Sequence, residues 1–213
     1  MLCHVKHSIF INSAALLLLA PLLCIAGSTG DRPFVPDPEA DQAPELHGAT
    51  WVAEGPTWVV RMQHLSEAER LAYLEKVTGL RIDPFASPPD KETRFTSFLV
   101  LIENRGESAL EMNPIHCWLK TNKGDLETPI GLDDLGFLYR VAGGDLPPAY
   151  VRVKPALLES TRTVYGGESI HGLLIYREVE PNNKSFRVDV QLSLPDGETA
   201  LVSAPYRRLK KKD

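Results

Sequence analysis

Residues 186–194 read Phe-Arg-Val-Asp-Val-Gln-Leu-Ser-Leu, and this stretch decides the fold class. Apolar and polar residues alternate along it, which is the period of a β-strand with one buried and one wet face. Pro195-Asp196-Gly197 then predicts a tight turn into a last strand at residues 199–204. The end of the chain therefore predicts an antiparallel strand pair.

Further short apolar runs separated by turn residues predict more strands towards the N-terminus. Residues 98–102, Phe-Leu-Val-Leu-Ile, are apolar on both faces and predict a central strand, within 95–104, that is covered on both sides. The other predicted strands are 51–52, 57–62, 112–121, 163–165 and 170–176. About seven short strands at this spacing indicate a mainly β fold, an antiparallel β-sandwich.

One or two short helices accompany these strands. Residues 66–69, Ser-Glu-Ala-Glu, form a capping box, and the helix that follows to Val77 is ended by Gly79. We expect this helix to cover an edge or an end of the sandwich. A second short helix is predicted over 132–139, and residues 145–155 predict a long irregular connection.

Two sequence signatures lie between residues 98 and 176. Residues 98–104 are a hydrophobic strand followed by Asn and a Gly turn, and residues 167–176 are Gly-Glu followed by a hydrophobic strand that contains Gly. With these signatures, residues 95–206 resemble the immunoglobulin-like sandwich domains of secreted bacterial envelope proteins. The resemblance implies an immunoglobulin-like β-sandwich in an accessory role. The antibody-type Cys–Trp–Cys pattern is absent, which excludes a true antibody-like domain.

The N-terminus has the order of a secretory signal peptide. Lys6 precedes an apolar stretch over residues 9–25, and Ala26, Gly27 and Ser28 supply small residues for cleavage before Thr29. We therefore expect export to the periplasm or the extracellular space. Two alternatives remain open.

An uncleaved segment would act as a membrane anchor, because about 17–25 apolar residues span a bilayer. A lipid on Cys24 would also anchor the chain, although Leu23 departs from the small residue that lipoprotein signals place there.

The chain is expected to have five parts. They are a signal peptide, a flexible linker, N-terminal strands with a helix and a Pro-rich loop packed on the sandwich, the β-sandwich domain, and a basic tail. In chain order the parts are residues 1–28, 29–48, 49–92, 93–206 and 207–213.

Charge is distributed unevenly along the chain. The net charge is −5, yet five basic residues stand in the last seven positions. An acidic body repels phosphate backbones, so we expect no nucleic-acid partner. The tail is predicted to lie outside the fold, either solvated or in contact with an anionic membrane or envelope surface. Its cations are Arg207, Arg208, Lys210, Lys211 and Lys212.

Copper is the sharpest metal hypothesis that the sequence offers. Met112, His116 and Cys117 lie close together, and sandwich folds hold blue copper through two His, a Cys and a weak Met. Neighbours on a strand point to opposite faces, however, and the next histidine is His171. Cys117 is the only Cys after the signal segment, so no internal disulfide is expected, and a buried, inert thiol is the favoured interpretation.

Other polar groups have structural interpretations. Asp133 and Asp134 suit the N-terminus of the second helix, and Glu103 beside Asn104 suits a strand edge or turn. Gly166-Gly167 lacks the Lys of a phosphate loop and predicts a hairpin turn. Aromatic residues that would line a ligand groove, or else fill the core, are Trp51, Trp58, Tyr139, Tyr150 and Tyr165.

The sequence contains neither a Gly-Xaa-Ser-Xaa-Gly elbow nor a His-Glu-Xaa-Xaa-His motif. We therefore assign no catalytic, cofactor-binding or metal-ligating residues. The expected function is that of an exported, non-catalytic envelope or periplasmic accessory protein that acts through protein or surface contacts. The alternatives are a β-sandwich that binds small ligands or carbohydrates, and an envelope hydrolase with a dispersed active site.

Overall fold

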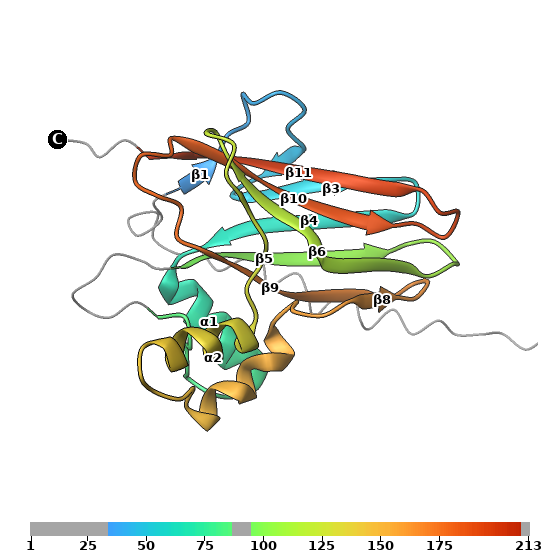
Figure 1. Cartoon of the computed structure of the whole chain (residues 1–213). Coiled ribbons are helices and arrows are strands. Elements are labelled where there is room, and N and C mark those ends of the chain that lie inside the picture. The colour runs from blue at the N-terminus through green and yellow to red at the C-terminus, as the bar shows by residue number, and fades with distance from the viewer. Residues whose placement is uncertain (1–33, 87–94, 210–213) are drawn as a thin grey trace, which may run out of the picture.

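A computed structural model describes residues 34–86 and 95–209. Two antiparallel sheets, A and B, pack against each other, and the helices lie together along one side of them (Figure 1). Sheet A contains, in spatial order, β1 (Phe34–Pro36), β11 (Thr199–Arg208), β10 (Ser185–Ser193), β6 (Leu110–Thr121) and β7 (Leu126–Glu127), and β8 (Arg162–Val164) also pairs with β6. Sheet B contains β2 (Glu45–His47), β3 (Thr50–Glu54), β4 (Trp58–Leu65), β5 (Phe95–Asn104) and β9 (Ser169–Arg177).

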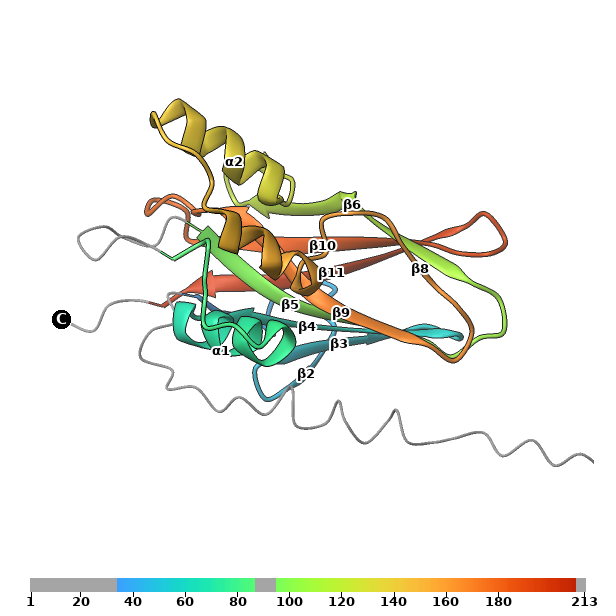
Figure 2. The same ribbon diagram turned by 90° about the horizontal axis from the view of Figure 1, so that it is seen from below.

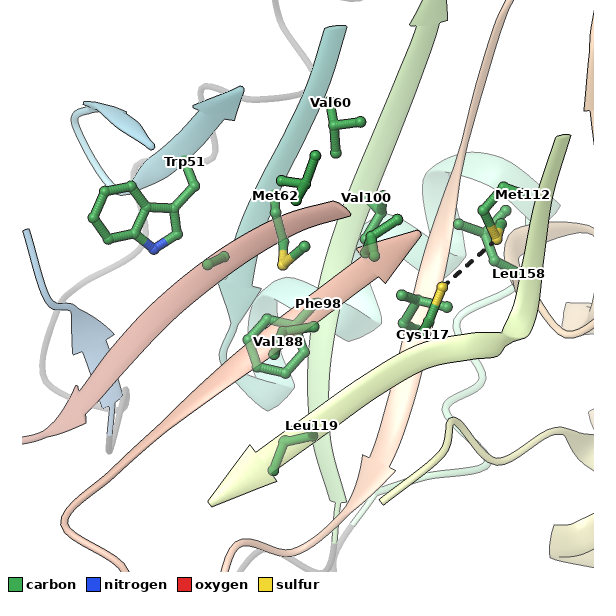
Figure 3. Packing of buried hydrophobic residues seen from close by; sticks show 14 of the residues in the cluster. Trp51, Val60, Met62, Phe98, Val100, Met112, Cys117, Leu119, Leu158 and Val188 are labelled. Carbon is green, nitrogen blue, oxygen red and sulfur yellow. Dashed lines mark hydrogen bonds between the residues drawn. The ribbon is translucent and has the colours of Figure 1, made fainter. Parts of the chain in front are cut away.

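The mainly β, two-sheet architecture predicted from the alternating strands is confirmed. Strand β10 turns Phe186, Val188, Val190 and Leu192 into the space between the sheets, as the alternation predicts. They meet side chains from β4, β5 and β6 in one apolar core (Figure 3). The predicted turn at Gly197, with φ of +84°, joins β10 to β11.

Strand β5 lies between β4 and β9 and is buried on both faces, so the central-strand prediction is confirmed. Phe98, Val100 and Ile102 belong to the core between the sheets. Phe95 and Leu99 face the other way and belong to a second apolar cluster under the helices. The helices are α1 (Glu67–Thr78), α2 (Leu132–Val141) and the 3-10 helix η3 (Pro148–Ala156).

Helix α1 begins with the predicted capping box: the Ser66 hydroxyl accepts from the Glu69 amide, and the Glu69 carboxylate accepts from the Ser66 amide at 2.8 Å. It ends at Gly79, whose φ of 71° is left-handed. The expectation that this helix covers an edge or end is wrong. It covers the outer face of sheet B (Figure 2), because Tyr73 and Leu74 pack in the cluster that contains Leu99 and Leu173.

Buried Arg70 ties α1 to the segment that follows it. Its side chain is 1% exposed and forms an ion pair with Asp83 at 2.9 Å. It also donates to the Phe85 carbonyl oxygen at 2.8 Å and to the Ser97 hydroxyl at 3.4 Å on β5. One guanidinium therefore joins the helix, the loop and sheet B.

Asn104 joins the two sheets where the chain crosses between them. Its side-chain amide donates to the carbonyl oxygens of Ser108 and Val164, both at 2.8 Å, and its Oδ1 accepts from the Gly106 amide. The Asn104 backbone is bonded to Gly167 and Glu168. The predicted hairpin at 166–167 is therefore wrong, because β8 pairs with β6 in sheet A and β9 pairs with β5 in sheet B.

The linker predicted over 29–48 is wrong from Phe34 onward. Strand β1 pairs with the end of β11, and β2 pairs with β3. Phe34 is 3% exposed and packs edge-on against Phe186 at 4.7 Å, so a single aromatic side chain fixes a segment that is otherwise poor in apolar residues. Pro36 is compatible with such an edge strand.

Two other boundaries are corrected. Residues 49–92 are not a unit packed on the sandwich, because β3 and β4 form one continuous sheet with β5. The tail begins later than Arg207, because Arg207 and Arg208 are the last residues of β11. The predicted signal peptide and residues 210–213 lie outside the described residues.

Replacing Asn104 by Ala is expected to lower the free energy of unfolding by about 3 kcal/mol, since the buried Val164 carbonyl group, the Ser108 carbonyl group and the Gly106 amide all lose their partner. Urea denaturation followed by circular dichroism measures this change. The control is Asn182→Ala in an exposed loop, which should stay within about 0.5 kcal/mol of the parent. Equal effects of the two changes would contradict the role given to Asn104.

Replacing Arg70 by Met is expected to cost about 3–5 kcal/mol, because it leaves the buried Asp83 carboxylate without its ion pair. Restoring neutrality with Asp83→Asn in the same chain should recover part of that loss. Arg81→Met removes an exposed pair with Glu75 and should cost at most about 1 kcal/mol. Thermal denaturation of the four proteins tests this order.

Candidate contact surface

The outer face of sheet A is the candidate contact surface. The buried side chains of α1, α2 and η3 belong to the cluster that contains Leu99 and Leu173 of sheet B, whereas the described side chains on the far face of sheet A belong to neither apolar cluster. Side chains on this face alternate with the core residues of β6, β10 and β11. They are therefore not needed to fill the core.

Asp189 lies at the centre of this face. It is directly opposite Trp118 on β6 and Ser203 on β11. Its carboxylate accepts from the Ser203 hydroxyl at 2.7 Å and pairs with Arg187 Nε at 3.0 Å, and only 4% of the residue is exposed. Asp189 thus holds the Arg187 guanidinium against the sheet.

Aromatic and aliphatic groups surround this polar centre. Trp118 is partly exposed, and its ring lies 6.2 Å from the ring of His116, also on β6. Leu201 on β11 is 55% exposed, Leu126 on β7 is 60% exposed, and Ile115 in β6 is 63% exposed. Exposed apolar groups gathered beside fixed polar groups are typical of a contact surface.

A second exposed apolar surface lies on α2. Phe137 is 59% exposed and Val141 is 71% exposed, whereas Leu132 and Leu135 on the opposite side of the helix are buried against η3 and sheet B. Helix α2 therefore has apolar groups on both sides, and one side has no cover within the described residues.

The proposed copper ligands do not converge. Cys117 and Met112 face the core, where the thiol lies 3.8 Å from the Met112 sulfur, while His116 lies on the outer face. His171 lies on β9 in the other sheet, where its Nδ1 shares a 2.8 Å hydrogen bond with the Tyr73 hydroxyl. Within the described ranges, no group of three or more His, Cys, Asp or Glu side chains is placed to hold a metal ion.

Burial, and then the nearby Lys76 charge, lower the pKa of His171. This histidine is therefore neutral at neutral pH and serves as a hydrogen-bonding partner of the buried Tyr73. Burial raises the pKa of the Cys117 thiol to about 12. A thiolate is the form that binds copper or reacts, so the core position disfavours both roles.

The carboxylates considered as catalytic groups are engaged in structural contacts. Asp134 accepts from the Gly131 amide at 2.8 Å, which confirms its predicted place at the N-terminus of α2. Glu103 pairs with Arg105 at 2.9 Å and Arg61 at 3.2 Å, and these bonds, Arg105 first, lower its pKa. A carboxylate with a lowered pKa is a weak general base.

A hollow of about 400 Å³ lies beside the start of α2. Ile115, Asp133, Lys154 and Glu159 are among the residues that line it. Glu159 pairs with Lys154 at 3.1 Å and accepts from the Leu132 amide at 2.9 Å. These charges are thus used to close the N-terminus of the helix.

The aromatic residues proposed for a ligand groove are dispersed. Trp51 is 1% exposed, and its indole nitrogen donates to the Pro205 carbonyl oxygen. Trp58 lies over Gly55, and Tyr165 stands exposed at the β8–β9 turn. Only Tyr139 and Tyr150 come together, with ring centroids 6.3 Å apart.

Trp118 and Asp189 are the surface residues that sequence reasoning missed. Asp189 stands at a wet-face position of the alternating strand, which was the available signal. Its pairing across the sheet with Trp118 is a non-local contact that the alternation alone does not contain.

Comparisons with known proteins show a likeness in structure only. No protein-family model matches the chain, and no curated protein is similar to it in sequence. The solved structures that match include the yjhA protein from Bacillus subtilis, with 14% identity and a TM-score of 0.37, and a Listeria monocytogenes protein of unknown function, with 12% identity and a TM-score of 0.41. The matches cover 76% and 75% of this chain, and 97% and 82% of those chains.

The helices in the described ranges include none with the length and apolar character needed to cross a membrane.

Cys117 is expected to react slowly with thiol reagents in the native state and rapidly in denaturant, because its thiol is buried and its pKa is raised. The measurement is the rate of labelling at pH 8 with and without urea. A Cys117→Ser variant measures the background labelling of Cys3 and Cys24 in the full chain. Native labelling at the denatured rate would show that the core opens at β6.

Proposed function

We propose that this chain is an exported, non-catalytic accessory protein that acts through contacts made by the outer face of sheet A. The observation that carries this proposal is the outer sheet face on which partly exposed Trp118 lies beside a fixed Asp189–Arg187 pair. The core does not require these side chains, and the exposed Leu126 and Leu201 give the face apolar area that a partner would bury.

Export is supported by the order of charged, apolar and small residues over positions 1–28. The finer assignment as an immunoglobulin-like sandwich is supported by the way Asn104 of the first signature meets Gly167 of the second. Two signatures far apart in sequence thus serve one structural purpose, which is the crossing between sheets.

A carbohydrate-binding sandwich is the second candidate, and Trp118 is the observation that favours it. A partly exposed indole on a sheet face, directly opposite Asp189 on β10, offers a surface on which a sugar ring stacks. Asp134 and Glu103 are engaged in helix capping and ion pairs and lend no support to the alternative of an envelope hydrolase.

Site-specific photo-crosslinking in the exporting cells tests the proposal. A photoreactive residue in place of Leu201 or Leu126 should give crosslinked products, since both side chains project from the outer face. The same residue at Val151, which is 53% exposed on η3, is the control and should give none. Products from Val151 or Phe137 alone would move the contact to the helical side, and products from no position would contradict a contact role.

A further inference from the structure

Both ends of the described chain meet at one end of sheet A. The fold begins at Phe34, which is paired with Arg208, and β11 ends there. The Arg208 guanidinium lies 4.5 Å from the Phe34 ring centroid and donates to the carbonyl oxygens of Val179, Glu180 and Asn183. The described ranges therefore begin and end side by side at this end of sheet A.

Cations gather at the same end of the sheet. Lys120 on β6 is directly opposite Arg187 on β10, and Arg207 lies on β11. Asn122 joins two adjacent turns, because its backbone amide donates to the Ser185 carbonyl oxygen and its Oδ1 accepts from the Lys184 amide. We call this group the basic end, and its members are Lys120, Lys123, Lys184, Arg187 and Arg207.

Three of these cations are uncompensated. Arg187 pairs with Asp189, and Arg207 lies 3.8 Å from Asp37. Lys120, Lys123 and Lys184 are exposed and have no ion-pair partner among the described residues. Like charges directly opposite each other on neighbouring strands destabilise the sheet. The stability of the fold therefore does not explain why Lys120 lies opposite Arg187.

Acidic groups also lie near this end of sheet A. Asp125 accepts from the Thr121 hydroxyl at 2.8 Å, and Asp189 is buried beneath Arg187. Glu178 and Glu180 lie on the loop that leads from β9 to β10, where the Glu180 carbonyl oxygen accepts from Arg208. The cations that remain without an ion-pair partner among the described residues are therefore Lys120, Lys123 and Lys184.

We infer that the basic end is the membrane-facing end of the molecule and that it binds the headgroups of anionic phospholipids. The inference rests on the proposed contact function and names its partner. The apolar N-terminal segment enters at this end, so it would bring the basic end to the bilayer surface from which the chain is exported or on which it stays anchored. Basic groups beside a bilayer gain from its negative surface potential.

Apolar groups at this end favour a bilayer over a soluble polyanion. Leu126 is 60% exposed directly opposite Lys120, and Leu209 follows β11 with 43% exposure. The C-terminal end of α2, with exposed Val141, points to the same end of the molecule (Figures 1 and 2). Aliphatic groups beside cations enter the headgroup region of a bilayer, whereas a soluble polyanion offers them no apolar phase.

Vesicle sedimentation tests the inference, with vesicles of phosphatidylglycerol and phosphatidylcholine compared with phosphatidylcholine alone. The exported form is the main sample, and the full chain measures what residues 1–28 add. The variant Lys120→Gln, Lys123→Gln, Lys184→Gln should bind the anionic vesicles about 100-fold more weakly, at about fivefold for each cation. The matched control Arg81→Gln, Arg105→Gln, Arg152→Gln removes the same charge from exposed positions elsewhere and should leave binding unchanged.

The apolar part of the inference has its own pair of variants. Leu126→Ser should weaken vesicle binding about tenfold, while Leu201→Ser, an exposed leucine at the other end of the same face, should not. The inference is overturned if the triple lysine variant and the triple arginine control lose equal amounts of binding to the anionic vesicles. The inference is also overturned if the lysine variant loses binding to dextran sulfate while Leu126→Ser leaves vesicle binding unchanged. That outcome points to a soluble anionic polymer. Crosslinks at Leu126 without vesicle binding keep the contact function and reject the membrane.

Discussion

The crossing of the chain between the two sheets at Asn104 is the constraint on which the rest of the fold depends. The β5–β6 and β8–β9 connections both change sheet at this end, and crossing segments leave backbone amides and carbonyl groups without strand partners. One buried side-chain amide satisfies three of them. The segments are also in close contact, since a Cβ atom on Gly166 would lie 2.6 Å from the carbonyl oxygens of Gly106 and Glu107. Only glycine allows this approach, and it fixes the distance between the sheets there.

Patterns of neighbouring residues predicted the strands and helices whose formation depends mainly on those neighbours. The alternation of residues 186–194 predicted which face of β10 is buried, and the capping box of Ser66 and Glu69 placed the start of α1. Strand β6 shows the limit of alternation. Met112 and Cys117 are five positions apart, so alternation places them on opposite faces, yet both lie in the core. The register of β6 against β10 shifts between them, next to Pro114, and this bulge resets the pattern.

The errors have non-local causes. The composition of residues 29–48 favours a linker, but Phe34 finds an aromatic cluster built by β4, β5, β10 and β11, and burial there outweighs the composition. Arg208 reads as part of a basic tail and instead donates to three carbonyl groups. The contact surface was missed for the same reason: Trp118, Asp189 and Ser203 are far apart in sequence and meet only across paired strands. The interpretations of Asp134 as a helix N-terminal residue and of Cys117 as a buried thiol agree with the structure.

Residues at one end of the sandwich are needed for stability, whereas residues on the outer face at the other end are free to contact a partner. At the Asn104 end, close packing and buried hydrogen bonds leave little freedom to change a residue. At the other end, the Arg208 guanidinium packs over the Phe34 ring at the end of the core. The side chains on the outer face are therefore not needed to cover the core there. A like-charge pair such as Lys120 and Arg187 costs roughly 0.2–1 kcal/mol, which a domain stable by about 5–15 kcal/mol tolerates. Charges that the fold tolerates and does not use remain available to an anionic partner.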